Sequence, residues 1–221
     1  MFAAAVRAPD PDALPEGIAD SKRLAPERRE ELAAELRADD RIAVGVAEVP
    51  VARIDDPETD MNTLTVAAHA EAVAEIVDAT GERADAAGTA GESPAVVEGI
   101  ADAGDTSEER FARRVADRVP AAVDLTAEHG ADDEHAVVGA ASVVAKVERD
   151  AHVAGLAERY AAEYGPEFAD VGSGYPSDPT TREFLEAFVA EHGRLPDCAR
   201  RSWSTCDDVL AEAAQSGLGD F

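Results

Sequence analysis

Residues 119–150 read VPAAVDLTAEHGADDEHAVVGAASVVAKVERD, and this stretch decides the fold class. Its first part, Val119 to Glu128, is a mainly apolar run with the length of a strand. From about Glu134 to Glu163 the apolar residues recur at helical spacing. A strand that leads through an acidic turn into a long helix is the repeating unit of an α/β protein.

The rest of the chain alternates in the same way. Apolar runs predict strands at 1–7, 41–49 and 95–100. Helical patterns predict helices at 25–37, 60–79, 106–118 and 180–192, and a last helix that ends near residue 214. Residues 8–24, 81–94 and 172–179 are predicted loops, and 81–94 has the composition of an insertion. We therefore expect an α/β fold with helices flanking a sheet.

The charge of the chain is strongly acidic. There are 47 acidic and 20 basic residues, which gives a net charge of -27, and 45% of the residues are hydrophobic. A disordered acidic tail would carry its charge in blocks, whereas here the acids are spread among periodic apolar residues. The composition indicates a folded protein with the hydrated acidic surface of a very salty cytoplasm. At about 1 M salt the Debye length is only about 3 Å, so a nucleic-acid partner is not excluded by the net charge.

Several classes of protein are excluded by what the sequence lacks. It has no apolar run of membrane-spanning length and no signal peptide, so we expect a soluble, cytoplasmic protein without a membrane partner. Its two cysteines, Cys198 and Cys206, have no accompanying histidine pattern and cannot make a metal site alone.

Only two lysines are present, Lys22 and Lys146; the other 18 basic residues are arginine. We take both as candidates for contact with an anionic substrate. The alternative for Lys146 is a helix lysine whose stem merely covers apolar surface.

Acidic residues follow two of the predicted strands. Asp102 comes after the strand at 95–100, and Asp132 lies between the strand that ends at Glu128 and the long helix. Side chains at the C-terminal strand ends of an α/β sheet face the site crevice, where two carboxylates can hold a divalent cation. The alternative is that both are ordinary turn aspartates. Their neighbours Asp105 and Asp133 are expected to be helix caps.

Two further local features stand out. Thr106 and Glu109 have the spacing of a capping box at a helix start. The predicted loop at 172–179 holds Tyr175 between glycines and prolines, so its ring could offer a stacking face to a sugar or base. The alternative is a tyrosine that covers the core.

Six motifs together resemble the archaeal branch of ribonuclease HII, the type 2 ribonuclease H family. They are ADSKRL (19–24), IADA (100–103), EHGAD (128–132), AASVVAKVERD (140–150), GSGYPSDP (172–179) and RSW (201–203). Their order and spacing match over nearly the whole chain, and the alanine- and acid-rich remainder is similar to halophilic members.

The resemblance implies a ribonuclease H-like mixed sheet and an endonuclease that cuts the RNA strand of RNA/DNA hybrids, including single embedded ribonucleotides. It implies Mg²⁺ or Mn²⁺ as cofactor, with two cations about 3.5–4 Å apart. Asp102 and Asp132 align with two of the family's four catalytic, metal-binding carboxylates. Tyr175 aligns with the tyrosine that packs on the sugar at the RNA–DNA junction. Ser21, Lys22 and Lys146 would bind the phosphate backbone or support the site.

The chain departs from the family pattern at its beginning. Members start with a strand carrying Asp-Glu-Ala-Gly, and no such stretch occurs here; residues 1–7 correspond to the second strand. We expect the first strand to be missing, little or no nuclease activity, and a gene start placed at an internal methionine.

This resemblance divides the chain into a core at 1–164, a helical substrate-binding extension at 165–214 and a tail at 215–221.

The tail resembles the peptide by which repair enzymes dock on a sliding clamp. Gln215, Leu218 and Phe221 have the required spacing, and the two apolar side chains would enter a pocket. The alternative is a frayed end whose Phe221 folds back on the core. We expect a monomer. The rival functions are a non-catalytic hybrid- or clamp-binding protein and a metal-dependent nuclease for another substrate.

Overall fold

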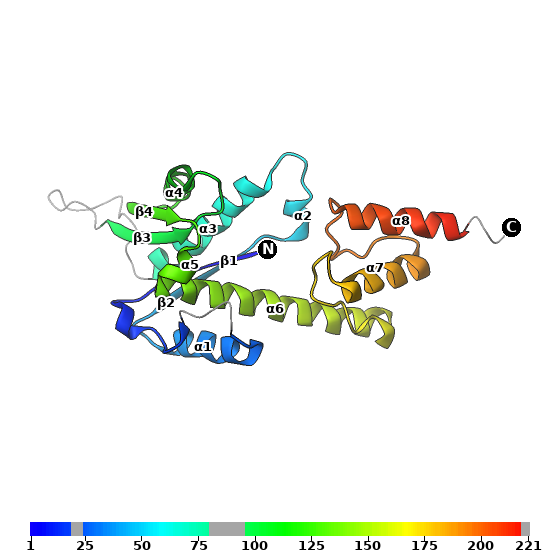
Figure 1. Cartoon of the computed structure of the whole chain (residues 1–221), viewed down its shortest axis with the longest axis horizontal. Coiled ribbons are helices and arrows are strands. Elements are labelled where there is room, and N and C mark those ends of the chain that lie inside the picture. Colours follow the sequence, from blue (N-terminus) through cyan, green and yellow to red (C-terminus); the bar gives the residue numbers. More distant parts are fainter. Residues whose placement is uncertain (19–23, 80–95, 218–221) are drawn as a thin grey trace. The chain divides into compact units, whose positions relative to one another are not determined.

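The computed structural model describes residues 1–18, 24–79 and 96–217 (Figure 1). These residues form two compact units, and each is described by itself. The first unit comprises Met1–Val49 and Thr59–Glu148, and the second comprises Pro50–Glu58 and Arg149–Phe221. The boundary between them falls within the long helix α6 (Ala136–Tyr164).

Two pairs of strands lie in the first unit. β1 (Phe2–Arg7) pairs antiparallel with β2 (Ala43–Glu48), and β3 (Val97–Asp102) pairs parallel with β4 (Val123–Glu128). Within the described residues the two pairs are separate two-stranded sheets. The expected α/β fold with parallel and antiparallel pairing is confirmed, although the pairing is divided between two sheets.

Helix α3 (Met61–Ala79) covers one face of the β1–β2 sheet. The approach is close at Gly45, where an added Cβ would lie 2.1 Å from the Ala72 carbonyl oxygen. Since real Cβ atoms do not come so near another atom, only glycine fits there. On the opposite face, α1 (Pro26–Ala38) and the first half of α6 bury one apolar cluster with residues of β1 and β2. Its fully buried members are Leu32, Ala33, Leu36, Ala140, Val143 and Val144.

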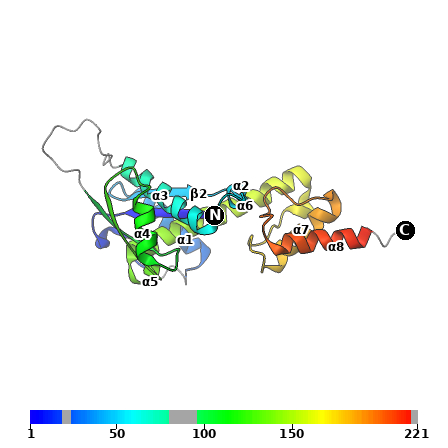
Figure 2. The same ribbon diagram turned by 90° about the horizontal axis from the view of Figure 1, so that it is seen from above.

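Helix α4 (Glu108–Ala116) packs on the β3–β4 sheet and against α3. Phe111 and Val115 of α4 are fully buried in a cluster with Val66 and Val77 of α3. Figures 1 and 2 show α4 beside these two strands. The two halves of the β-structure are thus joined through α3, which contacts both.

The second unit is helical. It contains α2 (Val51–Ile54), the second half of α6, α7 (Pro179–His192) and α8 (Ser204–Gly217). Its core is aromatic: the Phe188 ring lies edge-on to Tyr160 with ring centres 5.5 Å apart, and Tyr160 packs likewise on Phe184 at 5.2 Å. Edge-to-face geometry is favoured by the ring quadrupoles. Asp55 carboxylate oxygens accept hydrogen bonds from the backbone of Arg201 and Ser202, at 2.7 and 3.1 Å, which fastens the segment at 50–58 to this unit.

Most expected elements are confirmed to within a few residues. The strand expected at 95–100 runs from Val97 to Asp102, since pairing with β4 continues to Asp102 and makes this residue the last of the strand. The strand expected from Val119 begins only at Val123, because 117–122 form turns. The loop prediction for 81–94 lies outside the described residues. No helix among those described is long and apolar enough to cross a membrane.

Candidate active site

The candidate site is built at the C-terminal ends of β3 and β4. Asp102 and Glu128 are the last residues of these parallel strands and lie opposite each other. After β4 the chain turns at Gly130, which has a φ of 73°, a left-handed conformation that favours glycine. The Gly130 amide donates a hydrogen bond to Asp102 Oδ1 at 2.8 Å. The turn after one strand therefore holds the carboxylate at the end of the other.

Asp132 lies in the short helix α5 (Ala131–Glu134) directly after this turn. Asp132 is buried, with 6% of its surface accessible, whereas Asp102 is exposed. Both residues line one cavity of the first unit. The structure thus brings the two predicted metal ligands to the same cavity. The expectation that Asp133 caps the long helix is wrong: Asp133 lies inside α5, whose N-cap is Gly130, and α6 begins only at Ala136.

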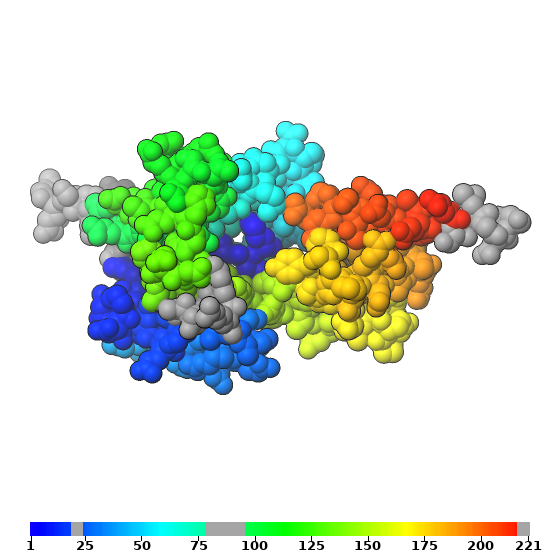
Figure 3. All heavy atoms as spheres, viewed as in Figure 1, coloured from blue at the N-terminus to red at the C-terminus, as the bar shows by residue number. Residues whose placement is uncertain are grey.

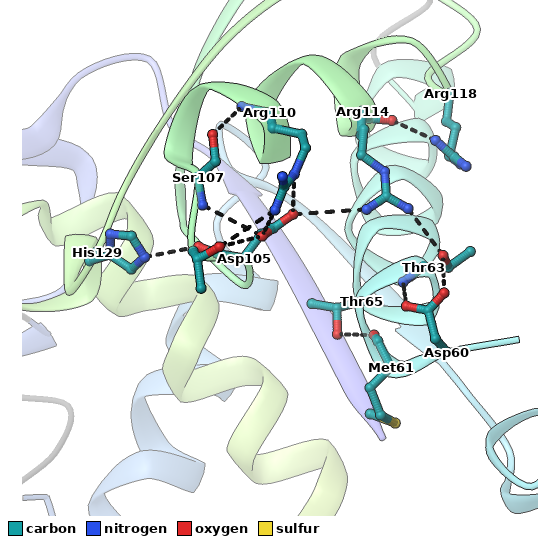
Figure 4. A network of polar contacts seen from close by, with 11 residues as sticks. Asp60, Met61, Thr63, Thr65, Asp105, Ser107, Arg110, Arg114, Arg118 and His129 are labelled. Carbon is teal, nitrogen blue, oxygen red and sulfur yellow. Dashed lines mark hydrogen bonds and ion pairs between the residues drawn. The ribbon is translucent and has the colours of Figure 1, made fainter.

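An ion-pair network lies behind the end of β3 (Figure 4). Asp105 is buried and accepts a hydrogen bond from Arg110 Nε at 2.9 Å and another from Arg110 Nη2. Arg114 lies 3.9 Å from the same carboxylate and donates to Thr63 Oγ1 on α3 at 3.1 Å. The Arg110 guanidinium holds the pKa of Asp105 well below its usual range. The network ties the loop after Asp102 to both α4 and α3.

Sequence reasoning assigned this loop incorrectly. The cap of α4 is Ser107, whose Oγ accepts a hydrogen bond from the Arg110 amide at 3.3 Å, and not Thr106 of the apparent capping box. Asp105, expected as a cap, is chiefly the partner of Arg110. The ion pair spans five positions in sequence, a spacing for which no local rule predicts contact.

His129 connects the turn after β4 to the start of α4. Its Nδ1 lies 2.8 Å from Glu108 Oε1, and its Nε2 lies 2.9 Å from the Asp105 carbonyl oxygen. The Glu108 carboxylate, which also accepts a hydrogen bond from the His129 amide at 2.8 Å, raises the pKa of this imidazole. These contacts join the loops that carry Asp102 and Asp132, and sequence reasoning did not find them.

The predicted lysines have different outcomes. Lys146 lies on α6 and its Nζ donates to Ser142 Oγ at 3.0 Å; Ser142 lines the same cavity as the two aspartates. Ser21 and Lys22 lie outside the described residues. Among those described, no group of three or more His, Cys, Asp or Glu residues is placed to hold a metal ion.

Tyr175 belongs to the second unit, where a polar scaffold holds its loop. Thr181 of α7 is buried; its Oγ1 donates to the Val171 carbonyl oxygen at 3.0 Å and accepts from the Gly174 amide at 2.9 Å. Asp178 caps α7 through the Thr180 amide at 3.1 Å and accepts from the Ser173 amide at 2.6 Å. The loop is therefore fixed at both ends by the start of α7.

Arg149 completes this loop. Its guanidinium donates to the Ser173 carbonyl oxygen and stacks on the Tyr175 ring, 4.4 Å from the ring centre. Tyr175 is 55% exposed, so the alternative of a tyrosine that covers the core is wrong. One face of the ring is held by Arg149 and much of the side chain remains open to a ligand. Sequence reasoning identified the tyrosine and missed the arginine.

The structure describes little of the predicted clamp peptide. Gln215 lies in the last turns of α8 and is exposed. Leu218 and Phe221 lie outside the described residues.

The fold, with parallel strands that end in carboxylates and a helical C-terminal unit, is similar to the folds of solved type 2 ribonucleases H. The model of the family described as Ribonuclease HII matches residues 1–206. The chain therefore belongs to the ribonuclease HII family, whose members are endonucleases that cleave the RNA strand of RNA/DNA hybrids.

Named relatives agree with this assignment. A Ribonuclease HII of Halobacterium salinarum is 59% identical over the whole of this chain and 92% of the relative. Ribonuclease HII in the PCNA complex from Archaeoglobus fulgidus is 33% identical, with a TM-score of 0.69 over 94% of this chain and 88% of that one. Ribonuclease H2 from Pyrococcus horikoshii is 26% identical, with a TM-score of 0.66 over 97% of this chain and 100% of that one.

Proposed function

We propose that Asp102 and Asp132 hold Mg²⁺ or Mn²⁺ for hydrolysis of a phosphodiester bond next to a ribonucleotide. The support is that two carboxylates from separate elements line one cavity, and that carboxylate oxygens are the ligands hard divalent cations prefer. The fit is partial, since two carboxylates alone leave most of a cation's coordination to other groups. When bound, the cations supply an activated water and charge stabilisation at the leaving oxygen.

The residues of this chain prepare that chemistry. The Gly130 amide fixes one Asp102 oxygen by a hydrogen bond, and Asp102 lines the cavity. The contacts of His129 and Asp105 hold the two carboxylate-bearing loops in one arrangement. Preorganised ligands need no rearrangement when the cation and the scissile phosphate arrive.

We also propose that two further carboxylates come from the family's Asp-Glu-Ala-Gly strand, which does not occur in residues 1–221. Residues 1–221 alone would then bind metal weakly and cleave little. The observation that carries this proposal is the division of the β-structure into two separate sheets with a cavity lined by both.

For the substrate, we infer that the exposed Tyr175 ring packs on the sugar at the junction between RNA and DNA. Arg149 holds the opposite side of the ring, so Tyr175 loses little freedom when it binds. Lys146, with Ser21 and Lys22, would contact phosphates or support the site. In this assignment 1–164 carries the catalytic groups and 165–214 contacts the substrate.

The test uses a duplex with a single embedded ribonucleotide, in high salt with Mg²⁺ or Mn²⁺. The 221-residue chain is compared with a version extended at its N-terminus by a strand that carries Asp-Glu-Ala-Gly. We expect only the extended version to cleave efficiently, and Asp102→Asn to abolish that cleavage. Absence of cleavage by both versions would support a non-catalytic hybrid-binding protein, and cleavage of an all-DNA duplex would indicate another substrate.

A second proposal concerns the tail. Gln215, Leu218 and Phe221 are proposed to bind a sliding clamp, and the similar Archaeoglobus fulgidus protein was solved in complex with PCNA. The test is calorimetric titration of the monomeric full chain into an archaeal clamp. Phe221→Ala should weaken binding at least tenfold, since apolar anchors dominate such peptides. Equal affinity of the variant would refute this role.

A further inference from the structure

His129 holds both of its ring nitrogens against oxygen atoms that can only accept hydrogen bonds. Nδ1 lies 2.8 Å from Glu108 Oε1, and Nε2 lies 2.9 Å from the carbonyl oxygen of Asp105, a contact drawn in Figure 4. A neutral imidazole has one N–H group, so it can donate only one of these hydrogen bonds. Both are made together only by the imidazolium form, which has an N–H on each nitrogen.

The Glu108 carboxylate is held in its ionised form. The backbone amide and the ring of His129 both donate to its Oε1, and these contacts lower the pKa of Glu108. Glu108 is also the first residue of α4, where the positive end of the helix dipole favours a negative charge. An ionised carboxylate has no hydrogen to donate, so Nδ1 must be the donor in this contact.

The ring of His129 joins the segments that carry the two candidate metal ligands. It lies in the turn after β4 and bonds the start of α4 and the loop after β3. That loop follows Asp102, and the turn leads through Gly130 to Asp132 in α5. The Gly130 amide also donates to Asp102 Oδ1 at 2.8 Å. The ring therefore supports the same junction between the two segments from a second position.

The charged groups around this ring favour its protonated form. The hydrogen bond to Glu108 of α4 is the main cause of a raised pKa of His129, followed by the bond to the Asp105 carbonyl. The negative charges of Glu108 and of Asp102, at the end of β3, act in the same direction, and partial burial acts against them. The carboxylate of Asp105 is paired with Arg110, so its backbone carbonyl is the group that serves the ring.

His135, at the other end of α5, provides a contrast. Its Nε2 lies 3.0 Å from Glu128 Oε2. Over residues 1–18, 24–79 and 96–217 this is the only hydrogen bond of the ring, and a neutral imidazole can donate it. The short helix is therefore flanked by two histidines, of which His129 needs the charged form to keep its contacts and His135 does not.

Loss of the proton from His129 would have a local effect. The side chain is 54% exposed, and in Figure 3 the green atoms of α4 and of the segment after β4 lie at the surface of the first unit. Water can therefore replace a partner that the ring releases. Deprotonation removes one of two contacts and loosens the two loops without unfolding the chain.

We propose that His129 is a positioning residue that acts as an imidazolium: by donating from both ring nitrogens, it holds the segments of Asp102 and Asp132 in the arrangement that binds a divalent cation. We call these two contacts the His129 bridge. Because the pKa of His129 is raised, the bridge is complete below about pH 6.5 and is lost as the pH rises through the raised value. The cation-binding part rests on the proposed function, whereas the doubly donating ring rests on the contacts alone.

The first experiment follows the ring of His129 in the 221-residue chain in high salt. Heteronuclear NMR shows whether each ring nitrogen carries a proton. At about pH 6.5, where an ordinary histidine is half protonated, we expect His129 to be protonated on both nitrogens, with a titration midpoint above that of His135. The signal of the Gly130 amide should move with the same midpoint, since the bridge holds this turn.

A matched pair of variants tests the partner of the ring. Glu108→Gln keeps an accepting oxygen but removes the charge, so the titration midpoint of His129 should fall. Glu109→Gln is the control, because Glu109 is the next residue of the same helix and its side chain is 93% exposed. It should leave the midpoint unchanged.

The second experiment measures Mn²⁺ affinity and cleavage by the extended chain across a range of pH. His129→Gln should lower both roughly 10- to 100-fold, the usual effect of removing an outer contact that orients metal ligands. His129→Arg retains a charge and several N–H donors, so it should cleave faster than His129→Gln. Glu108→Gln should shift the alkaline loss of activity to lower pH, and Glu109→Gln should not.

The proposal is overturned if His129 carries a proton on one nitrogen only at about pH 6.5, or if Glu108→Gln leaves its midpoint unchanged. A doubly protonated ring in an extended chain that does not cleave would refute the proposed metal chemistry and retain the bridge. Cleavage that is unaffected by His129→Gln, or that is lost at the same pH in the native and Glu108→Gln chains, would refute the positioning role alone.

Discussion

Thr181→Val tests how the loop that carries Tyr175 is held. Valine has nearly the shape of threonine but lacks the hydroxyl that bonds the Val171 carbonyl and the Gly174 amide, at 3.0 and 2.9 Å. Thr181 is 4% exposed, so water cannot simply replace the hydroxyl. An unsatisfied buried backbone group costs about 1–3 kcal/mol.

We expect Thr181→Val to lower the free energy of unfolding by about 1–3 kcal/mol, since Val171 is buried whereas Gly174 is only half-buried and can reach water. The measurement is urea denaturation in high salt, with equal slopes required for the comparison. Thr180→Val is the matched control, because the neighbouring threonine contributes its backbone amide rather than its hydroxyl to the cap. It should change stability by less than about 0.5 kcal/mol.

The same substitution should also affect function. Once the loop is loosened, the Tyr175 ring loses its fixed position, and the extended chain should bind its substrate about tenfold more weakly, within the roughly 1–3 kcal/mol of an aromatic stacking contact. The KM should rise more than kcat falls, because the contact lies away from the reacting atoms. If Thr181→Val is as stable as Thr180→Val, the scaffold described for this loop is wrong.

Three further predictions follow from the site. In the extended chain, Asp102→Asn and Asp132→Asn should each lower the cleavage rate at embedded ribonucleotides at least about 100-fold, because a preorganised charge contact is lost. The control Asp133→Asn, on the exposed side of α5, should have little effect. Similar rates for all three variants would contradict the metal assignment. Arg149→Lys should weaken substrate binding severalfold, since lysine cannot both stack on Tyr175 and bond the Ser173 carbonyl, while Arg159→Lys on the same helix should not. Burial lowers the pKa of His69, so its neutral form contributes stability that is present above about pH 6.5 and is lost as the pH falls. Urea titrations at several pH values should show less acid destabilisation in His69→Gln than in the native chain. An unchanged pH dependence would refute this prediction.

Much of the fold was predictable because its signals are local. Helical apolar spacing identified the long helices, and Pro26 correctly marked one helix start. The candidate carboxylates were also predictable, since Asp102 follows an apolar strand and Asp132 follows the next. The division into a parallel and an antiparallel strand pair required contacts between distant segments and could not be read from periodicity.

The errors occurred where several residues compete for one structural role. Thr106, Ser107 and Asp105 are all good caps by residue type, and the choice was made by Arg110, which draws Asp105 into an ion pair and leaves Ser107 to cap α4. In the turn after β4, Gly130 has a left-handed backbone conformation and occupies the N-cap position of α5, and Asp133 lies inside that helix. Such choices depend on geometry across a turn, where sequence spacing gives equal support to each candidate.

By itself the sequence determined the element types, the acidic surface, the family resemblance and the identity of the candidate ligands, because each of these is carried by composition, periodicity or motif. Only the tertiary structure decided that Asp102 and Asp132 line one cavity and that Arg149 supports Tyr175. The physical reason is that these features depend on which backbone edges and side chains meet across long separations in the chain. Burial and hydrogen-bond satisfaction in the folded molecule determine these long-range contacts.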